Sequence, residues 1–305
     1  MFRMLAAGAV LLLSLPQDMP AQVKLEPKYI EGSKTTLDVE TVTDQTLTLG
    51  GADVETGATT FMLMTVDVGK READGTLPIR QQITQLQSEV SLPGGLKLMF
   101  DSGNPDKKAD NPALEVLMDV FRATLKGTVT KTLDKDNKVQ SVSVAKEAVE
   151  NLDEQFKSQF DEEKLKAAAI QEQKVFPAEP VKVGDTWDRT EVATLSAGQS
   201  LTFESTYKYA GTVEKDGRTL DRIEQTIKSV SLDQDANAPG PARIANADVK
   251  IESGTATLLF DRKRGVTVSH DSKVHMKGDL TLSINGNDLP GKLDLTIKSK
   301  ITLKE

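Results

Sequence analysis

Apolar and polar residues alternate strictly over long stretches of this chain. In residues 293–303 the alternation places aliphatic side chains on one side of the chain and mainly lysine and threonine on the other. The aliphatic set is Leu293, Leu295, Ile297, Ile301 and Leu303. Residues 201–213 repeat the pattern. A period of two is that of a β-strand with one buried face and one wet face, so we expect long antiparallel strands.

The same alternation recurs along most of the chain. It is found in residues 37–49, 62–68, 77–83, 129–133, 139–144 and 280–284. Turn residues separate these stretches: Gly50-Gly51, Asp74-Gly75, Asp136-Asn137, Asp216-Gly217 and Asn285-Gly286. Such pairs suit tight hairpins because they tolerate positive φ. Strands connected by hairpins should therefore dominate the fold.

Helical spacing is confined to the middle of the chain. Residues 114–125 carry an apolar stripe that begins after Asn111-Pro112 and stops before Gly127. We expect further helices over 146–158 and over 162–171, the latter starting after Asp161. These two should form a helical connector at 145–176, between a β-rich amino-terminal half with one helix (22–144) and a β-rich carboxyl-terminal half (177–305).

The two halves share landmarks in the same order. Gly-polar turns at Gly32 and Gly184 each precede a long strand. The stretches 90–92 and 230–232 both read Val-Ser-Leu, and 98–101 and 258–261 both end in Phe-Asp. An internal duplication explains this order, and coincidence among similar strands is the alternative. The expected fold is α+β and β-dominated, with two pseudo-repeated, curved antiparallel sheets and about three helices.

The first residues have the composition of a secretory signal. Arg3 precedes an apolar stretch over 4–15, followed by Pro16 and a small residue at Ala21. We expect residues 1–21 to be a signal peptide cleaved near Ala21, a buried amino-terminal helix being the alternative. No long apolar span follows, so the mature chain should contain no transmembrane segment. The protein is therefore expected to be exported, to the periplasm or outside the cell.

Composition excludes several classes of function. Lys and Arg total 38 against 46 Asp and Glu, giving a net charge of −8 that repels nucleic acid. With no cysteine, the chain can form no disulfide, thiolate zinc site or cysteine nucleophile, and only two histidines are present. We expect no cofactor and no bound metal.

Candidate catalytic motifs fail on geometry. Ser269, His270 and Asp271 are adjacent, and neighbouring residues of a strand point to opposite faces, so they cannot form a relay. His270 and His275 should also lie on opposite faces, as two surface histidines. Residues 233–244 lack the glycine and glutamate of a calcium loop, and 134–138 suits a hairpin tip. The chain is expected not to be an enzyme; a hydrolase using dispersed carboxylates stays an alternative.

Short turn motifs carry a resemblance to a family. The turns at Gly32 and Gly184, residues 98–102, and Phe176-Pro177 leading into 183–187 resemble an uncharacterised family of exported bacterial proteins, frequent in planctomycete-type bacteria. The resemblance implies no activity and no site residues. More loosely, long strands curving around helices are similar to half-barrel lipoprotein carriers and sensors of the bacterial envelope.

The apolar strand faces are the remaining functional candidate. They must be covered by helices, by a second sheet or by a lipid-like ligand. The side chains expected to contact such a ligand are Phe203, Tyr207, Tyr209, Trp187 and Phe260, with Met62 and Met64 beside them. The leading hypothesis is a non-catalytic exported binding or scaffold module of the bacterial cell envelope, and the alternative is a carrier or sensor for a hydrophobic ligand. A lipid and an envelope protein are the two candidate partners.

Overall fold

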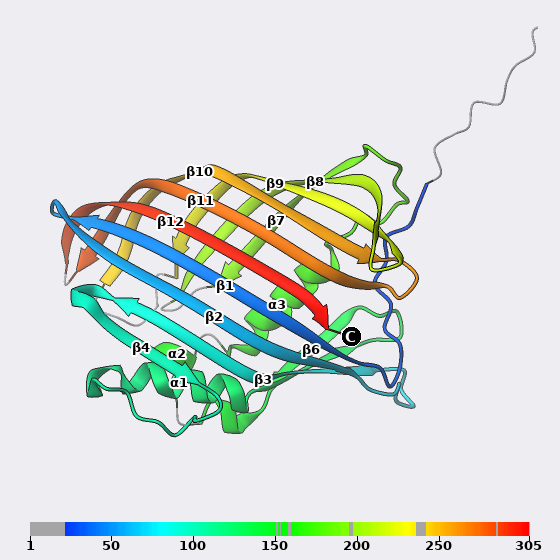
Figure 1. Cartoon of the computed structure of the whole chain (residues 1–305), viewed down its shortest axis with the longest axis horizontal. Helices are drawn as coiled ribbons and strands as arrows, with labels where there is room; N and C mark the ends of the chain where they lie inside the picture. Colours follow the sequence, from blue (N-terminus) through cyan, green and yellow to red (C-terminus); the bar gives the residue numbers. More distant parts are fainter. Residues whose placement is uncertain are drawn as a thin grey trace, which may run out of the picture.

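Twelve antiparallel strands form one sheet, which curls around a concave inner face (Figure 1). This computed structural model describes residues 22–150, 152, 154–157, 160–194, 198–235, 242–284 and 286–304. The expected signal peptide, residues 1–21, lies outside them. The strands are β1 (Lys34–Leu49), β2 (Ala52–Val68), β3 (Leu77–Leu92), β4 (Leu96–Asp101), β5 (Thr128–Leu133), β6 (Val139–Val144), β7 (Thr186–Thr194), β8 (Gln199–Lys215), β9 (Arg218–Gln234), β10 (Ala242–Asp261), β11 (Val266–Ile284) and β12 (Asn287–Lys304). Their order is β6-β5-β3-β2-β1-β12-β11-β10-β9-β8-β7, with β4 also paired to β3.

The expectation of two sheets is wrong, because the first and last strands pair. β1 and β12 run side by side from the Thr36–Lys304 pair to the Leu49–Gly291 pair, which joins both halves in the middle of one sheet. Each half still contributes a meander, β1–β4 and β7–β10. The shared landmarks lie in the third and fourth strands of these meanders. The duplication itself stays a prediction.

The predicted alternation is confirmed in the last strand. Leu293, Leu295 and Leu303 are buried on the inner face of β12, while Lys292, Lys298 and Lys300 are exposed on its outer face. Several strands are longer than their alternation indicated, β2 and β11 most of all. Tight turns connect them as expected. Gly50 and Gly51 have φ of 58° and 85°, and Asp216 and Gly217 have φ of 52° and 71°, which suits two-residue hairpins.

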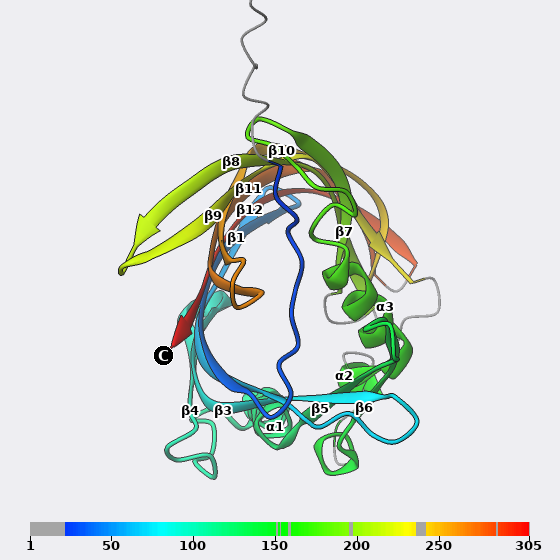
Figure 2. The ribbon, with the colours of Figure 1, turned by 90° about the vertical axis from the view of Figure 1, so that its right-hand side faces the viewer.

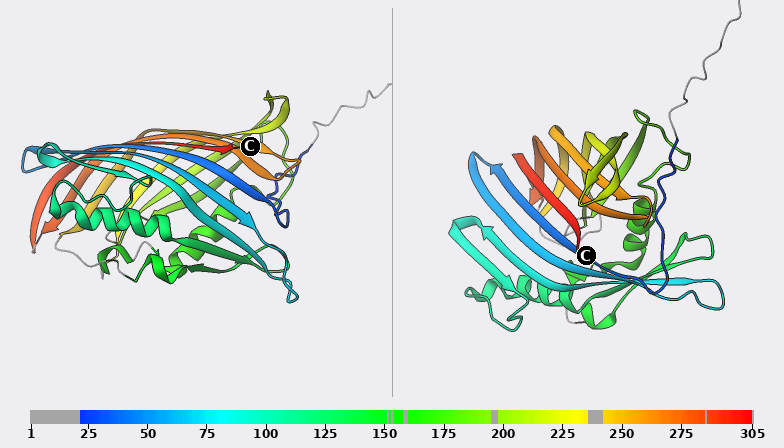
Figure 3. Two further views of the ribbon diagram at one scale, coloured as in Figure 1. Left: turned by 60° about the horizontal axis from the view of Figure 1, so that its bottom comes forward. Right: turned by 45° about the vertical axis from the view of Figure 1, so that its right-hand side comes forward.

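Helix α1 (Glu115–Lys126) forms where the sequence predicted it. A 3-10 turn at Pro112–Leu114 precedes it, and the Asn111 side chain accepts a hydrogen bond from the Ala113 amide at 3.0 Å. The apolar stripe of the helix packs on the inner face over β3 and β4. The two views in Figure 3 show the helices on the concave side of the sheet.

Helix α3 (Glu162–Gln173) connects the two edges of the sheet. The Asp161 side chain caps it by accepting from the Lys164 amide at 2.9 Å. The helix contacts both edge strands, β6 and β7, so that strands and helix together enclose the inner face (Figure 2). At the β6 edge the Val139 amide donates to Gln173 Oε1 at 3.1 Å, and at the β7 edge Arg189 Nη2 donates to the Gln171 carbonyl at 2.5 Å.

The helix expected over 146–158 does not form as a continuous element. A 3-10 turn occupies Lys146–Ala148 and the short helix α2 only Glu154–Lys157. Ala145, which precedes the turn, makes no side-chain cap hydrogen bond, so the first turn lacks the partner that stabilises a helix start. Ala148 is buried at 2% exposure and Leu152 at 7%. The apolar residues thus reach the core from separate turns.

The segment before β1 crosses the concave side of the curled sheet at one end (Figure 2). We call residues 22–33 the strap. Val23 pairs with Val181 through two backbone hydrogen bonds, and the Lys28 amide donates to the Gly265 carbonyl at 3.0 Å. Leu25 is buried at 2% exposure. Within the part of the chain that the structure describes, no helix has the length and apolar character required to cross a membrane.

Candidate functional site

Four apolar clusters cover most of the inner face. One lies under α1, a second under α3, a third beneath the strap, and a fourth is built from the strands β8 to β12 with Leu47 of β1. Because the core side chains of each cluster are buried, these regions are filled core. The candidate site is therefore sought among the inner-face residues that belong to none of the four clusters.

An apolar patch remains between the clusters on β1, β2 and β12. It consists of Leu37, Val39, Met64 and Ile301, which we call the open patch. Leu37 is the register partner of Met64, and Val39 that of Ile301, so the four side chains face the same side as the buried Leu303. All four are only half-buried and belong to none of the four clusters.

A row of polar side chains crosses the inner face beside this patch. Register partners on successive strands define it: Tyr207, Gln225, Ala256, Ser272, Ser299, Thr41, Thr60 and Ser88. All except Ala256 carry a hydrogen-bonding group. We call this row the polar belt. The rows on both sides are mainly apolar, with His270, Thr43 and Ser205 as exceptions, and one of them includes Val39 and Ile301 of the open patch.

The middle of the polar belt is accessible. Thr41, Thr60, Ser272 and Ser299 are half-buried, whereas Ser88 at one end is 5% exposed. Thr60 and Ser88 share a hydrogen bond of 3.0 Å. Among the described residues, the hydroxyls of Thr41 and Ser299 have no hydrogen-bond partner. The belt therefore offers free donors and acceptors between two apolar surfaces.

Four of the five predicted ligand residues gather at the other end of the belt. Trp187 stacks on Tyr207 with ring centroids 5.7 Å apart, and Tyr207, Tyr209 and Phe260 are at most 3% exposed in the cluster beneath the strap. Phe203 lies apart, against the cluster of β8 to β12. The rings of Tyr207, Tyr209 and Phe260 are therefore part of the filled core beneath the strap. Ligand contact stays a prediction for all five residues. Met62 packs with the cluster under α1, and Met64 belongs to the open patch.

Tyr209 and Arg262 together hold the buried carboxylate of Asp221 in place. Its hydroxyl donates to Asp221 Oδ1 at 2.7 Å, and Arg262 binds both carboxylate oxygens at 2.8 and 2.9 Å. Asp221 is 1% exposed. Burial, with the Asp221 carboxylate next to it, raises the pKa of Tyr209 to about 12. This network is fully paired and is structural.

A second carboxylate, Glu191 of β7, stands at the end of the polar belt. Tyr207 donates to its Oε1 at 2.5 Å and Gln225 Nε2 to its Oε2 at 3.0 Å. Gln225 also donates to Ser205 Oγ at 3.0 Å. Burial and the adjacent Glu191 carboxylate raise the pKa of Tyr207 well above its usual value. Glu191 was not singled out from the sequence. The available signal was its alternate spacing with Trp187 and Arg189, which places all three on the same face of β7.

The two histidines lie on opposite faces, as predicted. His270 is on the inner face, where it pairs with Ile301 and Leu258, and His275 Nε2 lies 2.8 Å from Asp294 Oδ1 on the outer face. Both are half-buried, so neither is fully exposed as the expectation of two surface histidines implied. Burial lowers its pKa, and the carboxylates of Glu191 and Asp271 oppose that shift.

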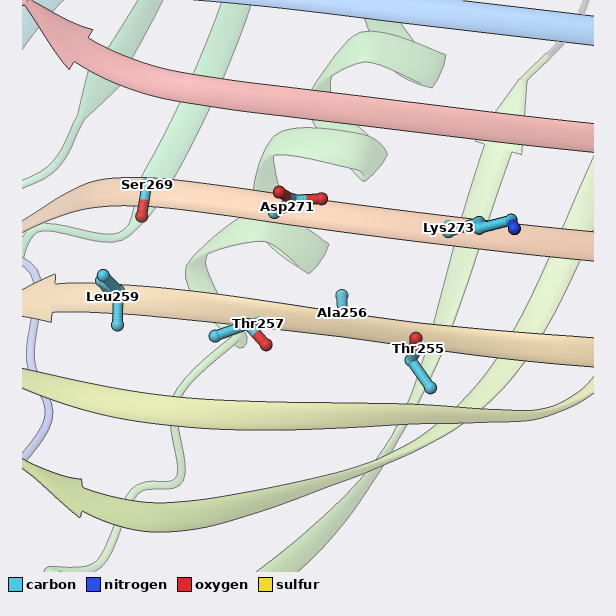
Figure 4. A pocket seen from close by; sticks show the side chains of 7 residues that line it. All are labelled: Thr255, Ala256, Thr257, Leu259, Ser269, Asp271 and Lys273. Carbon is cyan, nitrogen blue, oxygen red and sulfur yellow. The ribbon is translucent and has the colours of Figure 1, made fainter.

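Ser269 and Asp271 point away from His270, which confirms that the three form no relay. They line a polar depression of about 350 Å³ on the outer face of β10 and β11, together with Lys273 (Figure 4). Thr255, Ala256, Thr257 and Leu259 complete its lining. The described residues contain no group of three His, Asp or Glu placed to hold a metal ion.

Solved structures show distant similarity. A lipovitellin structure titled "Lipid-protein interactions in lipovitellin" aligns over 91% of this chain at 10% identity with a TM-score of 0.46, and this chain spans 26% of the lipovitellin chain. DynF, from the dynemicin biosynthesis pathway of Micromonospora chersina, aligns over 96% of this chain and 92% of its own at 7% identity, with a TM-score of 0.18. The outer membrane protein OprG of Pseudomonas aeruginosa aligns over 90% of this chain and 97% of its own at 6% identity, with a TM-score of 0.19. These TM-scores do not define a common fold.

No curated protein matches the chain in sequence. A family model does match part of it, from Asp74 in the β2–β3 loop to Asp221 in β9, slightly less than half of the chain. This segment contains α1, α3 and both edge strands that α3 connects. The match fits the expectation of an uncharacterised family, while a bacterial source and export stay predictions. By this comparison, residues 74–221 are similar to a family of unknown function (DUF6263).

Proposed function

We propose that the protein is a non-catalytic binding module that holds an amphipathic, chain-like molecule on the inner face of its sheet. The observation that carries the proposal is the pairing of two accessible surfaces. The open patch offers apolar contact, and the polar belt beside it offers hydroxyl groups. A ligand with an apolar chain and a polar group matches both surfaces at once.

The physical reason is the cost of leaving the patch uncovered. Burying an aliphatic side chain fully contributes about 1.5–3 kcal/mol, so four half-buried ones leave several kcal/mol for a ligand chain to gain. The unpartnered hydroxyls of Thr41 and Ser299 would gain hydrogen bonds to a polar group of the ligand. Export to a cell envelope, where lipids are abundant, is part of the same proposal.

The test uses N-phenyl-1-naphthylamine, an uncharged apolar dye whose fluorescence rises in apolar surroundings. Two valines of β1 provide a matched pair of variants: Val39 lies on the inner face in the open patch and Val42 on the outer face, and both are half-buried. We expect saturable dye binding to the wild type and to Val42→Asp, and a loss of about tenfold or more in Val39→Asp.

Two further measurements complete the test. The melting temperature of each variant shows that it is folded, and native mass spectrometry of protein purified from its own source shows whether a ligand copurifies. Equal dye binding by both variants, or none by the wild type, would contradict the proposal. In the second case a scaffold role with protein partners becomes the better hypothesis.

A further inference from the structure

The polar belt ends in a carboxylate, Glu191, that forms no ion pair with any described residue. Glu191 is half-buried on the inner face, and its register partner on β8 is the apolar Phe203. Both hydrogen-bond donors to it are fixed: Tyr207 is 3% exposed and Gln225 is 6% exposed. Its carboxylate is therefore held in one orientation on the inner face of the sheet.

Nearby cations are engaged elsewhere. Among the described residues no Lys, Arg or His nitrogen lies within ion-pair distance of Glu191. Arg189, the nearest basic residue on the same strand face, donates to the Gln171 carbonyl, and its guanidinium lies 5.9 Å from the centre of the Tyr207 ring. Burial lowers the pKa of His270, which disfavours its charged form, and the Glu191 carboxylate opposes that shift. Glu191 thus presents to the inner face a carboxylate that lacks an ion-pair partner among the described residues.

Such a charge discriminates between polar groups. A partly desolvated carboxylate attracts an ammonium group and accepts a hydrogen bond from a hydroxyl, and it repels a second carboxylate. Resting on the proposed function, we infer that Glu191 makes the inner face select amphiphiles whose polar group is an ammonium over those that end in a carboxylate. A hydroxyl-bearing chain ranks between the two.

The experiment compares three ligands with the same chain of carbon atoms: dodecylamine, 1-dodecanol and laurate. Each competes with N-phenyl-1-naphthylamine for the wild-type protein at pH 7, below the concentration at which the ligand aggregates. We expect the amine to bind about tenfold more tightly than laurate or better, with the alcohol between them.

The decisive variant is Glu191→Gln, which keeps the size of the side chain and removes its charge; its amide oxygen can accept one of the two hydrogen bonds, and the Tyr207 hydroxyl can rotate to accept from its amide nitrogen. It should lose the amine's advantage over laurate, and because the alcohol is uncharged its affinity should change far less than that of the amine. The matched control is Glu204→Gln, an exposed residue on the outer face of β8. It changes the net charge equally, so a loss of preference there would attribute the effect to long-range attraction.

The outcomes separate this inference from the proposed function. If all three ligands displace the dye with the same affinity, or laurate binds best, the inference is wrong and the proposed function stands. If none displaces the dye and none raises the melting temperature, the proposed function is wrong as well.

The Glu191→Gln variant has an outcome of its own. If its affinity for all three ligands falls equally, Glu191 only orders Tyr207 and Gln225, and the inference is wrong. Should Glu191→Gln fail to fold, Glu191→Asp keeps the charge one bond further back and should keep the amine preference in weakened form.

Discussion

Gly278 shows how tightly single residues are constrained where β10 and β11 pair. A Cβ atom built on this glycine would lie 2.0 Å from the Asp248 carbonyl oxygen and 2.5 Å from the Val249 Cα atom. Both are backbone atoms, which cannot rotate out of the way. The two strands approach each other here at a distance that only glycine allows.

Substituting Gly278 by alanine should therefore destabilise the protein by about 1–3 kcal/mol, since either strand must shift. The control is Gly57→Ala in β2, where the nearest atom, the Thr43 carbonyl oxygen, would be 3.5 Å from the new Cβ. That variant should lie within about 0.5 kcal/mol of the wild type. Urea unfolding followed by the fluorescence of Trp187 measures both. A Gly278→Ala protein as stable as Gly57→Ala would contradict the argument.

At the scale of elements, the charged side chains of Glu115 and Arg122 hold the start of α1 against the loop that precedes it. Glu115 accepts hydrogen bonds from the Ala109 amide at 2.9 Å and from Arg122 Nη1 at 2.8 Å. Arg122 in turn donates to the carbonyls of Pro105 and Lys107. The loop between β4 and α1 is thereby attached to the helix. The Ala109 amide, followed by Arg122, lowers the pKa of Glu115 to about 2.

This lowered pKa makes part of the free energy of unfolding depend on pH. A carboxyl whose pKa is lower in the folded state than in the unfolded state stabilises the fold above the unfolded value, here 4.5, and that contribution disappears as the pH falls towards 2. In Glu115→Gln the free energy of unfolding should change less between pH 5 and about pH 2 than in the wild type. Urea titrations at several pH values in that range measure the difference. Parallel curves for the two proteins would refute the assignment.

Local signals explain which elements the sequence predicted. For α1, the cap at Asn111, the apolar stripe and Gly127 all agree, and the helix forms there. In residues 146–158 the stripe stood alone, without a capping side chain, and the helix was replaced by separate turns. The role of α3 in connecting β6 to β7 could not be predicted, because it depends on edges that are defined only once all strands have paired.

The candidate site was predictable only in part for the same reason. Alternation identified the inner face of β12 and the aromatic residues of β8. To predict the polar belt, one would have to know the register of eight strands, including bulges such as the one between Glu204 and Ser205. A shift of one residue in any strand would move its hydroxyl to the outer face. No single stretch of sequence carries that information.

On the scale of the whole molecule, β12 is the piece on which both halves depend. It pairs with β1 on one side and with β11 on the other, and it buries Leu293, Leu295 and Leu303. These three side chains represent about 5–9 kcal/mol when buried, comparable to the net stability of about 5–15 kcal/mol of a typical protein. The strand that comes last in the described chain thus lies in the middle of the sheet.

A chain that ends at Ile284 should therefore show no cooperative unfolding transition and no near-ultraviolet circular dichroism of packed aromatic rings. Adding a synthetic peptide of residues 286–304 should restore both, because the peptide supplies the missing ladders and apolar face. The full-length chain with the same peptide is the control and should not change. Cooperative unfolding of the truncated chain alone would show that the halves are independent.

The β1–β12 ladder also determines how the molecule would respond to force. The strands are antiparallel, and Thr36 pairs with Lys304, so the start of β1 and the end of β12 lie together at one end of the ladder. A pull across Lys34 and Lys304 would load the hydrogen bonds one pair after another, as in a zipper, instead of shearing them all at once. The sheet would then open along its middle at low force, and the inner face would be released while the two outlying meanders were still paired.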